Sequence, residues 1–392
     1  MKLIHRLVAF VAVLPAFAFA VYAPIPEQDQ GKAFTVRLGG SIYHDSNIFG
    51  SASNEVDSMV YTFSPSIAYN GSVSDQTFVS AGYDLNIDHV ADRPTKKNLT
   101  SQTFSARLAH SFDKATNLDV SDNYQIAKNP ASLLTGLPGQ TDQSFKSNQL
   151  DARYNTTLNE KTTFALKLRH TSLAYDLPSL ASQLDRMDSL AGVEVAFALL
   201  PETKLVGEYR YQDIAYDNTG SLRDKRSNFL LVGVDYNSSR KVTLSARAGI
   251  EDRNRSGAAD SNSGYLELSS RYNYAESSFL SGGYVYTIEE PSDILNYTDT
   301  DVSRFFVNVQ HQVSALVTAS GSLTWAPSKL QGRPGQHKDI DETTTRLGFA
   351  LSWTPNKNWT VSATLDSDRI SSDDVNREQN RDRFGVSARF TF

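Results

Sequence analysis

The chain has 392 residues, with 38 basic and 44 acidic side chains and a formal net charge of −6. This acidic balance argues against a nucleic-acid partner, which usually requires a basic stripe on the protein. Cysteine is absent and the seven histidines are scattered without ligand-like spacing, which excludes disulfides, thiol catalysis and cysteine-ligated zinc.

The first twenty residues have the pattern of a secretory signal peptide. Lys2 and Arg6 form a positive start, an apolar core follows, and a small-x-small site ends at Ala20, with Ala23 as a second possible cleavage point. The competing interpretation is an uncleaved anchor, but the apolar stretch is short for a span of about 20 residues. We predict a cleaved signal peptide at 1–20 and a short periplasmic lead-in at 21–32.

Beyond residue 32 the polarity alternates with a period of two, which is typical of half-exposed strands and not of helices. In the first run, Phe34, Val36 and Leu38 share one face, while Thr35 and Arg37 share the other. Eighteen such runs follow one another, each near the about 9–11 residues that a tilted membrane strand needs. In chain order they are 33–43, 58–69, 77–89, 102–112, 117–126, 144–158, 162–175, 186–200, 204–216, 228–237, 242–253, 264–274, 279–288, 303–313, 315–325, 344–354, 358–368 and 381–392.

The connections between these runs alternate in length. Those after even-numbered runs are short, and the Asn70-Gly71 dipeptide after the second run predicts a tight hairpin turn. Those after odd-numbered runs are longer and polar, for example 128–143, 217–225, 255–262, 289–299 and 329–341. Short turns on one rim and long loops on the other are typical of bacterial outer-membrane barrels, whereas a soluble β-sandwich has no reason to alternate them.

We therefore predict an all-β fold: a transmembrane antiparallel up-and-down β-barrel of about 18 strands over residues 33–392. Its place is the Gram-negative bacterial outer membrane, in contact with lipid and lipopolysaccharide. A mean hydropathy of −0.39 is compatible with this, because lipid-facing and lumen-facing residues average out.

Aromatic side chains gather at two levels, as the interfaces of a bilayer require. The level near the short turns contains Trp353, Trp359, Tyr69, Phe197, Tyr236, Tyr272, Tyr274 and Phe390. The opposite level contains Tyr83, Tyr209, Tyr211, Tyr284, Tyr286 and Trp325. The competing interpretation is that these residues form the core of a sandwich.

Two residues interrupt the pattern. Pro65 lies inside a run and cannot donate a ladder hydrogen bond, so we expect a bulge or a poorly paired stretch there. Asp122 falls on the lipid-facing parity, which is costly in mid-bilayer. We therefore expect either a bulge that shifts the register between 118 and 126 or a position of Asp122 near a rim.

The last run alternates up to the final residue, with Phe384, Val386, Ala388, Phe390 and Phe392 on one face. Such an ending resembles the signal by which the bacterial barrel assembly machinery recognises its substrates. We predict Phe392 as the assembly signal and that machinery as a partner.

Sorting the remaining charged residues by parity predicts an inward face that is rich in charge, because charges in hydrocarbon would be costly. One interpretation is cross-strand ion pairing that stiffens the wall, for example among Arg169, Arg186, Asp188, Glu208 and Arg210. The other is a path for a polar or anionic solute. The pore-lining candidates are Arg37, Asp84, Arg107, Asp119, Arg153, Arg169, Arg186, Asp188, Glu208, Arg210, Arg247, Glu267, Arg271, Arg304, Arg346 and Arg389.

Catalysis finds little support in the sequence. There is no nucleophile elbow, no metal-ligand spacing and no glycine loop of the kind that cradles phosphate. We predict no enzyme activity, no cofactor and no metal.

The first strand runs through Arg37-Leu38-Gly39-Gly40-Ser41-Ile42-Tyr43-His44 into Asp45-Ser46-Asn47-Ile48-Phe49. A glycine-bearing strand that enters Asp-Ser-Asn-Ile-Phe resembles the beta-barrel porin type 2 family of proteobacterial outer membranes. The resemblance implies a barrel that passes an exopolysaccharide or capsular polymer, with periplasmic export components as partners. From their chemistry, Asp45 and Asn47 are expected to form a turn by bonding nearby backbone amides.

Three functions are therefore considered. The first is export of an exopolysaccharide, which the resemblance implies. The second is a general or nutrient-uptake porin. The third is a structural or surface-binding barrel, which predicts a lumen packed by its own charged side chains and loops 128–143 and 329–341 that carry the binding.

Overall fold

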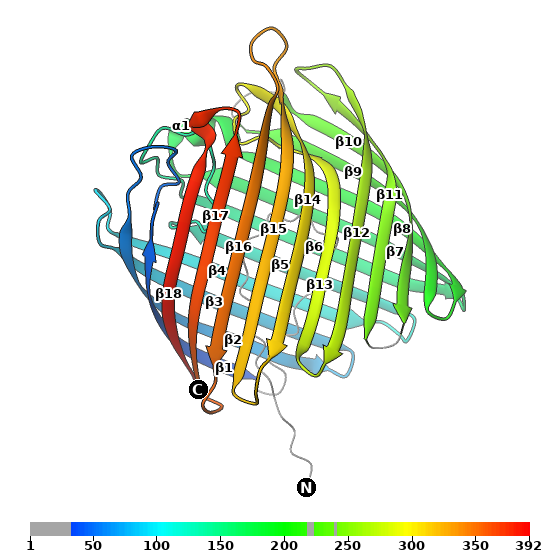
Figure 1. Cartoon of the computed structure of the whole chain (residues 1–392). Coiled ribbons are helices and arrows are strands. Elements are labelled where there is room, and N and C mark those ends of the chain that lie inside the picture. Colours follow the sequence, from blue (N-terminus) through cyan, green and yellow to red (C-terminus); the bar gives the residue numbers. More distant parts are fainter. Residues whose placement is uncertain (1–32, 218–222, 239–240) are drawn as a thin grey trace.

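The computed structural model describes residues 33–217, 223–238 and 241–392, so the predicted signal peptide and lead-in lie outside the described residues. Eighteen antiparallel strands form one sheet, and Figure 1 shows β12 to β18 in front with the earlier strands behind. Their bounds are Phe34–Asp45 (β1), Ser58–Ser74 (β2), Thr77–Val90 (β3), Asn98–Ser111 (β4), Thr116–Ala127 (β5), Phe145–Asn159 (β6), Thr162–Tyr175 (β7), Arg186–Leu200 (β8), Thr203–Tyr216 (β9), Lys225–Ser238 (β10), Val242–Arg255 (β11), Ser261–Ala275 (β12), Ser278–Glu289 (β13), Tyr297–Gln312 (β14), Val317–Gly332 (β15), Ile340–Trp353 (β16), Trp359–Ser372 (β17) and Gln379–Thr391 (β18).

The sheet is closed into a barrel by pairing of its first and last strands. β1 pairs with β2 on one side and with β18 on the other, where Arg37 lies opposite Thr391 and Asp45 lies opposite Arg383. Every other strand pairs with its two neighbours in the chain. Closure leaves no sheet edge exposed, and the prediction of an up-and-down barrel of about 18 strands is confirmed.

The two rims differ as the sequence predicts. The rim at which β1 begins and β18 ends has short turns, at 75–76, 112–115, 160–161, 201–202, 276–277, 313–316 and 354–358. The opposite rim carries the longer connections, among them 46–57, 91–97, 128–144, 176–185 and 290–296. By the rule for bacterial barrels, the short-turn rim faces the periplasm and the long-loop rim faces the outside.

The predicted hairpin turn at Asn70-Gly71 is wrong. Both residues lie inside β2 and pair with Ser80 and Val79 of β3, and the chain turns only at 75–76. Neither residue has the positive φ that a tight Asn-Gly hairpin turn requires. The alternation simply continues, which makes β2 longer than predicted.

The outer surface of the barrel is apolar. Along β10, Leu230 and Val232 are 62% and 67% exposed, while Phe229 and Leu231, which alternate with them, are 5% and 1% exposed. Large apolar side chains exposed on alternate residues around a closed wall are unfavourable in water and favourable in lipid. The protein is therefore an integral barrel of the Gram-negative outer membrane.

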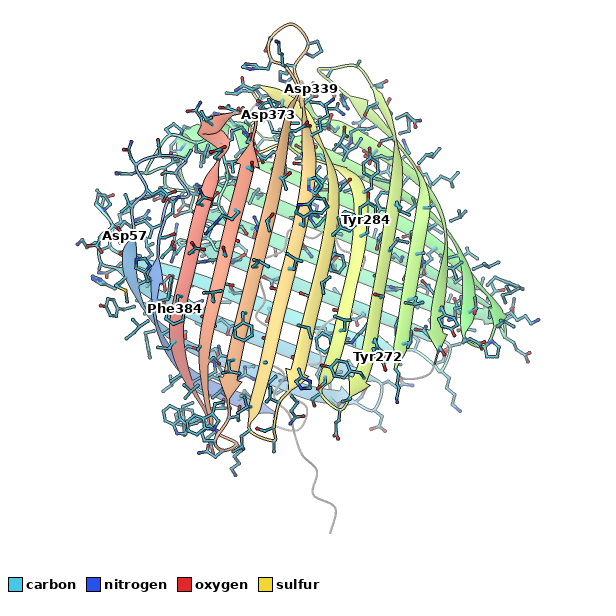
Figure 2. All side chains as sticks on the ribbon, in the orientation of Figure 1. Asp57, Tyr272, Tyr284, Asp339, Asp373 and Phe384 are labelled. Carbon is cyan, nitrogen blue, oxygen red and sulfur yellow. The ribbon has the colours of Figure 1, made fainter. Side chains whose placement is uncertain are left out.

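The aromatic residues lie on this outer surface at two levels. Figure 2 labels Tyr284 in the upper part of the wall and Tyr272 in the lower part. Trp353 lies opposite Val317, eight residues along β15 from Trp325. At about 3.3 Å per residue this is about 26 Å along the strand, or about 20 Å along the membrane normal at a tilt of about 40°, comparable with the apolar band of such barrels.

Pro65 leaves a poorly paired stretch and no bulge. The ladder between β2 and β3 passes from the pair Phe63–Ile87 to the pair Ser66–Asp84 without a shift in register. Since proline has no N–H to donate, the ladder weakens locally while the alternation of faces is kept.

The expectation of a register error around Asp122 is wrong. β5 pairs continuously with both neighbours, and Asp122 lies opposite Ala106 of β4 and Leu150 of β6. Ala106 and Leu150 are exposed on the outer surface, so Asp122 faces lipid in the middle of its strand. No bulge shifts the parity of β5 here, so this carboxyl group lies in the apolar band and lowers the stability of the barrel locally.

Two short helical segments lie on the long-loop rim, α1 (Pro178–Leu184) and η2 (Val375–Arg377). Among the described residues, no helix is long and apolar enough to cross a membrane.

Candidate functional site

The sixteen predicted pore-lining residues all lie on the inward parity of their strands. On β1, for example, Val36 and Leu38 are exposed to the outside while Arg37 between them faces inward. The paired residues of neighbouring strands continue these rows around the barrel. The lumen is therefore lined by charged and polar side chains, which must meet water or one another.

Ion pairs occupy the wall formed by β4 to β7. Arg107 binds Asp119 through two hydrogen bonds, Nε to Oδ1 at 3.0 Å and Nη2 to Oδ2 at 2.6 Å. Arg169 donates to Asp151 at 2.6 Å across the β6–β7 pair. Such two-point and charge-assisted contacts fix the orientation of side chains that would otherwise reach into the lumen.

The predicted ladder of Arg169, Arg186, Asp188, Glu208 and Arg210 is found in part. Arg169 pairs with Asp151, outside the predicted set, and the Asp188 carboxylate accepts hydrogen bonds from Gln212 Nε2 at 2.9 Å. Within the predicted set, Glu208 and Arg210 bind each other, with both Nε and Nη2 of the arginine at 2.9 Å from the Glu208 carboxylate. Arg186 lies within electrostatic range of Asp188. The barrel brings residues together along rows set by register, which single-strand parity does not determine.

A buried cluster of charges lies on the inward face from β7 to β12. Lys167 Nζ lies 2.7 Å from Glu194 Oε2 and 2.9 Å from Glu208 Oε1, and Glu208 has no exposed side-chain surface. Arg247 adds a contact to Glu194 at 3.4 Å and binds Asp235 at 2.8 Å. Because these groups shield one another from solvent, this part of the lumen is filled by its own side chains.

The cluster continues through an aromatic residue that the sequence does not single out. Tyr265 Oη accepts a hydrogen bond from Arg210 Nη1 at 3.1 Å and donates one to Glu267 Oε2 at 2.8 Å. Tyr265 has the inward parity of its strand, which is the only sequence signal that points to it. Its hydroxyl joins the arginine and the carboxylate into one network.

The remaining predicted residues line the other side of the lumen. Arg304 binds Glu289 at 2.8 Å, and Arg346 lies 3.8 Å from Asp368. The guanidinium of Arg271 stacks 3.8 Å from the ring centre of Phe279, near the short-turn rim. Arg37 and Arg389 lie near each other and near Asp84, within electrostatic range. Together these side chains give the lumen wall both charge signs and many hydrogen-bonding groups.

Residues 128–144 connect β5 to β6 at the long-loop rim and fold inward; we call them the crossing segment. Asn129 Nδ2 donates to Tyr43 Oη of β1 and to Asp88 Oδ2 of β3, both at 3.1 Å. The carbonyl oxygen of Ala131 accepts from Arg381 Nη1 of β18 at 3.0 Å. The crossing segment is thus tied to strands that lie well outside its own hairpin.

Apolar contacts carry the crossing segment to the opposite wall. Leu134 and Leu137 pack against a buried cluster that contains Leu180 and Leu184 of α1 and Ile294 of the β13–β14 connection. β5 and β14 stand on opposite sides of the ring of strands. A contact between their connections therefore spans the extracellular mouth, so that the crossing segment covers it.

A buried arginine also links the connections of the long-loop rim through polar contacts. Arg377, in η2 before β18, donates from Nη2 to Thr135 Oγ1 at 2.9 Å and to Ser292 Oγ at 3.0 Å, and from Nε to Glu342 at 2.9 Å. It is 3% exposed. One guanidinium thereby links four parts of the long-loop rim, and the sequence gives no local signal for it.

The far end of the crossing segment is held by a carboxylate, Asp142. Burial alone would raise the pKa of Asp142, but hydrogen bonds from Ser144 and the charges of Arg93 and Lys96 outweigh it, so the pKa is lowered from 3.8. Arg93 Nη2 lies 3.7 Å from the carboxylate. Asp142 is therefore ionised at neutral pH and anchors the segment to the β3–β4 connection.

The Asp45–Phe49 motif lies at the seam where β1 meets β18. Asp45 Oδ1 accepts from the backbone N of Asn47 at 3.1 Å, and Asn47 Nδ2 donates to the carbonyl oxygens of Ser51 and Asn380 at 2.8 and 3.1 Å. Ser46 Oγ accepts from the backbone N of Asp382 at 2.8 Å. The motif thus makes a turn and at the same time fastens the last strand to the first.

The apolar end of the motif packs in a buried hydrophobic cluster and does not line the lumen. Ile48 and Phe49 are buried in one cluster with Val60, Val90 and Leu99, at the tops of β2, β3 and β4. Within the described residues, no group of three or more histidine or acidic side chains is placed to hold a metal ion. The geometry offers a polar conduit and a covered mouth.

No family model matches the chain, and no curated protein matches it in sequence. Among solved structures, the outer membrane protein OpdK from Pseudomonas aeruginosa is similar with a TM-score of 0.49 and 12% identity, over 92% of this chain and 99% of that one. OccAB4 from Acinetobacter baumannii has a TM-score of 0.48 and 9% identity, over 93% and 99%. A bacterial polysaccharide outer membrane secretin has a TM-score of 0.35 and 10% identity, over 92% and 97%.

Proposed function

We propose that this outer-membrane β-barrel channel exports an exopolysaccharide or capsular polymer through a gated extracellular exit. The observation that carries the proposal is the crossing segment, which covers the mouth at the long-loop rim. The turns that the structure describes on the other rim are two to five residues long and too short to reach across the lumen. Among the connections that the structure describes, the one that covers the conduit therefore lies at the exit for a polymer that arrives from the periplasm.

The chemistry of the lumen supports a polar, uncharged or weakly charged chain as substrate. Ion pairs such as Arg107–Asp119 and Arg304–Glu289 present hydrogen-bonding groups while their charges are largely balanced. A saccharide can replace its hydrogen bonds to water with hydrogen bonds to these groups, and no single charge sign dominates along its path. The resemblance of residues 37–49 to exopolysaccharide-linked barrels points in the same direction.

Deletion of the gene tests the proposal, with surface polymer as the readout. We expect the deletion strain to lose its matrix or capsule, and the intact chain to restore it. A chain whose crossing segment is shortened should also restore export but make cells permeable to large antibiotics. Normal polymer on the surface of the deletion strain would refute export.

Nutrient uptake is the second candidate, because a wall that carries both charge signs also suits small polar solutes. It is separated from export by swelling of liposomes that contain the purified intact barrel. Rapid swelling in sugars, together with normal polymer in the deletion strain, would favour uptake.

A structural or surface-binding barrel is the third candidate. The self-packed charges around Lys167 and Glu208 favour it for one side of the lumen. A barrel that stays silent in a bilayer even after the crossing segment is shortened would favour this function over both kinds of transport.

A further inference from the structure

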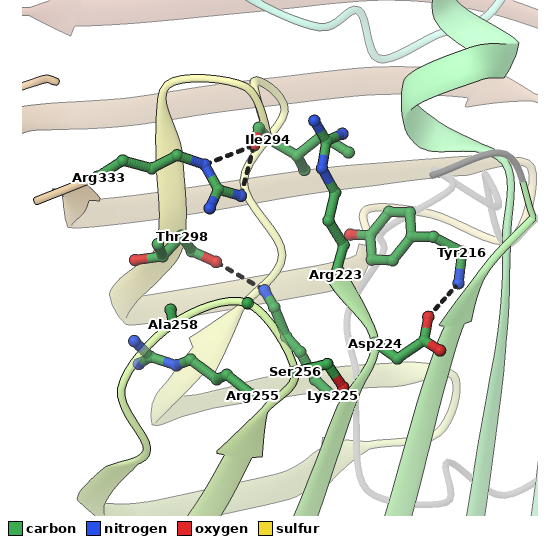
Figure 3. A pocket seen from close by; sticks show the side chains of 11 residues that line it. Tyr216, Arg223, Asp224, Lys225, Arg255, Ser256, Ala258, Ile294, Thr298 and Arg333 are labelled. Carbon is green, nitrogen blue, oxygen red and sulfur yellow. Dashed lines mark hydrogen bonds between the residues drawn. The ribbon is translucent and has the colours of Figure 1, made fainter. Parts of the chain in front are cut away.

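Four cationic side chains converge on a pocket at the extracellular mouth, shown in Figure 3. Arg223 precedes β10, Lys225 begins it, Arg255 ends β11, and Arg333 follows β15. The cavity between them has a volume of about 20 Å³, which is close to the space that one water molecule needs, and it continues into open solvent.

Two of these cations are neutralised by carboxylates beneath the pocket. Lys225 Nζ lies 2.7 Å from Glu290 and 3.2 Å from Asp299. Arg255 Nη2 lies 2.6 Å from Asp299. Burial alone would raise the pKa of Glu290, but Lys225 and Arg253 hold it at about 2, so the carboxylate is ionised at every physiological pH.

The other two cations lack such partners. Among the residues that the structure describes, no carboxylate oxygen lies within 4.0 Å of the guanidinium of Arg223 or of Arg333. Arg333 donates from Nε and Nη2 to the carbonyl oxygen of Ile294 at 3.2 and 2.9 Å, as Figure 3 shows. Arg333 is therefore held by a backbone carbonyl and not by a close ion pair among the described residues.

Two donors without a hydrogen-bond partner also lie at this pocket. Arg223 Nη1 and Arg255 Nε are buried and have no hydrogen-bond partner, although the Arg255 side chain is only 8% exposed. Burial, and then the nearby charge of Arg333, lower the pKa of Arg223 from 12.5, although Tyr216 and Asp293 act in the opposite direction. Two like charges beside buried, unsatisfied donors are unfavourable unless an anion or ordered water completes them.

We propose that this pocket binds one acid group, a phosphate or a carboxylate, at the extracellular mouth of the barrel. The planar guanidinium groups of Arg223 and Arg333 offer paired N–H donors that match the oxygens of either group. Arg255 Nε contributes a further donor from the pocket wall. The site does not depend on the direction of transport, since it uses only residues of the long-loop rim.

The experiment is calorimetric titration of the purified full-length barrel in detergent at low salt, with inorganic phosphate and, separately, with glucuronate. Arg223→Gln removes the charge and the unpartnered donor. The matched control is Arg226→Gln, because Arg226 lies three residues away on the outer surface, is 69% exposed and pairs with Asp213. Arg333→Gln provides an independent second variant, and a heat-modifiable electrophoretic band verifies that each variant is folded.

We expect saturable binding of at least one probe at one site per chain. Loss of a charge-assisted hydrogen bond should weaken it about tenfold or more in Arg223→Gln and Arg333→Gln, and the control should bind like the intact chain. Binding of phosphate alone assigns a phosphate-bearing ligand, and binding of glucuronate assigns an acidic sugar. Absence of saturable binding, or equal binding by all variants, would overturn the site. Since the titration involves no transport, its failure leaves the proposed export function standing.

Discussion

Arg381 is the side chain whose loss should perturb the barrel most. It donates from Nε to Asp45 Oδ1 at 3.0 Å and from Nη2 to Oδ2 at 2.6 Å, across the seam between β18 and β1. Its Nη1 also holds the carbonyl oxygen of Ala131 in the crossing segment at 3.0 Å. The substitution Arg381→Met keeps an unbranched stem, lacks the guanidinium group and removes all three contacts.

The expected magnitude follows from burial. The side chains of Arg381 and Asp45 are 2% and 1% exposed, so the substitution leaves a buried carboxylate without a cationic partner. Breaking one side of such a pair costs about 3–5 kcal/mol, whereas removing both charges costs much less. The double variant with Asp45→Asn should therefore recover most of the loss.

The assay is reversible denaturant unfolding in vesicles, followed by tryptophan fluorescence. Arg369→Gln is the matched control, because its ion pair with Asp382 is at the same rim but 43% and 52% exposed. It should cost less than about 1 kcal/mol. Equal losses for Arg381→Met and Arg369→Gln would refute the argument that burial at the seam determines the energy.

Three further outcomes follow from single residues. Asp122→Leu should raise the free energy of unfolding by about 1–2 kcal/mol, because Asp122 faces lipid. Asp119→Leu should lower it by about 1–3 kcal/mol, because Asp119 holds an arginine in the lumen, and the opposite signs would contradict the assignment of faces. Phe392→Ala should reduce the assembled, heat-modifiable protein in outer membranes, and Phe384→Ala on the same face should not. The pKa of Asp142 is lowered from 3.8, so its anchoring of the crossing segment is present above that value and lost as pH falls through the lower folded pKa; bilayer conductance should be constant between about pH 7 and 5 and rise below about pH 4.

Much of the fold is predictable because a barrel wall imposes a period of two on every strand. That period gives the number of strands, the alternation of short and long connections, and the inward parity of residues such as Arg37 and Arg247. It also gives the outward parity of Asp122 correctly, and the expected bulge near that residue is absent from the pairing of β5. Local pattern is sufficient wherever lipid and water alternate from one residue to the next.

Partners and loop paths are not predictable in this way. Arg169 binds Asp151, a partner that the sequence does not single out, because the register of neighbouring strands decides which side chains meet. The contact between Arg377 and Thr135 joins residues far apart in the sequence, and it follows no periodicity. Such contacts depend on how loops cover the mouth after the wall has closed.

The central claim is that the crossing segment closes an otherwise continuous polar conduit. Ala127 and Phe145 are paired neighbours, so a four-residue glycine-serine linker can replace residues 129–143 without moving β5 or β6. Single-channel recording in a planar bilayer compares the two proteins directly. The intact barrel should show low, intermittent conductance and the shortened one a large, steady conductance; equal conductance in both would contradict the claim.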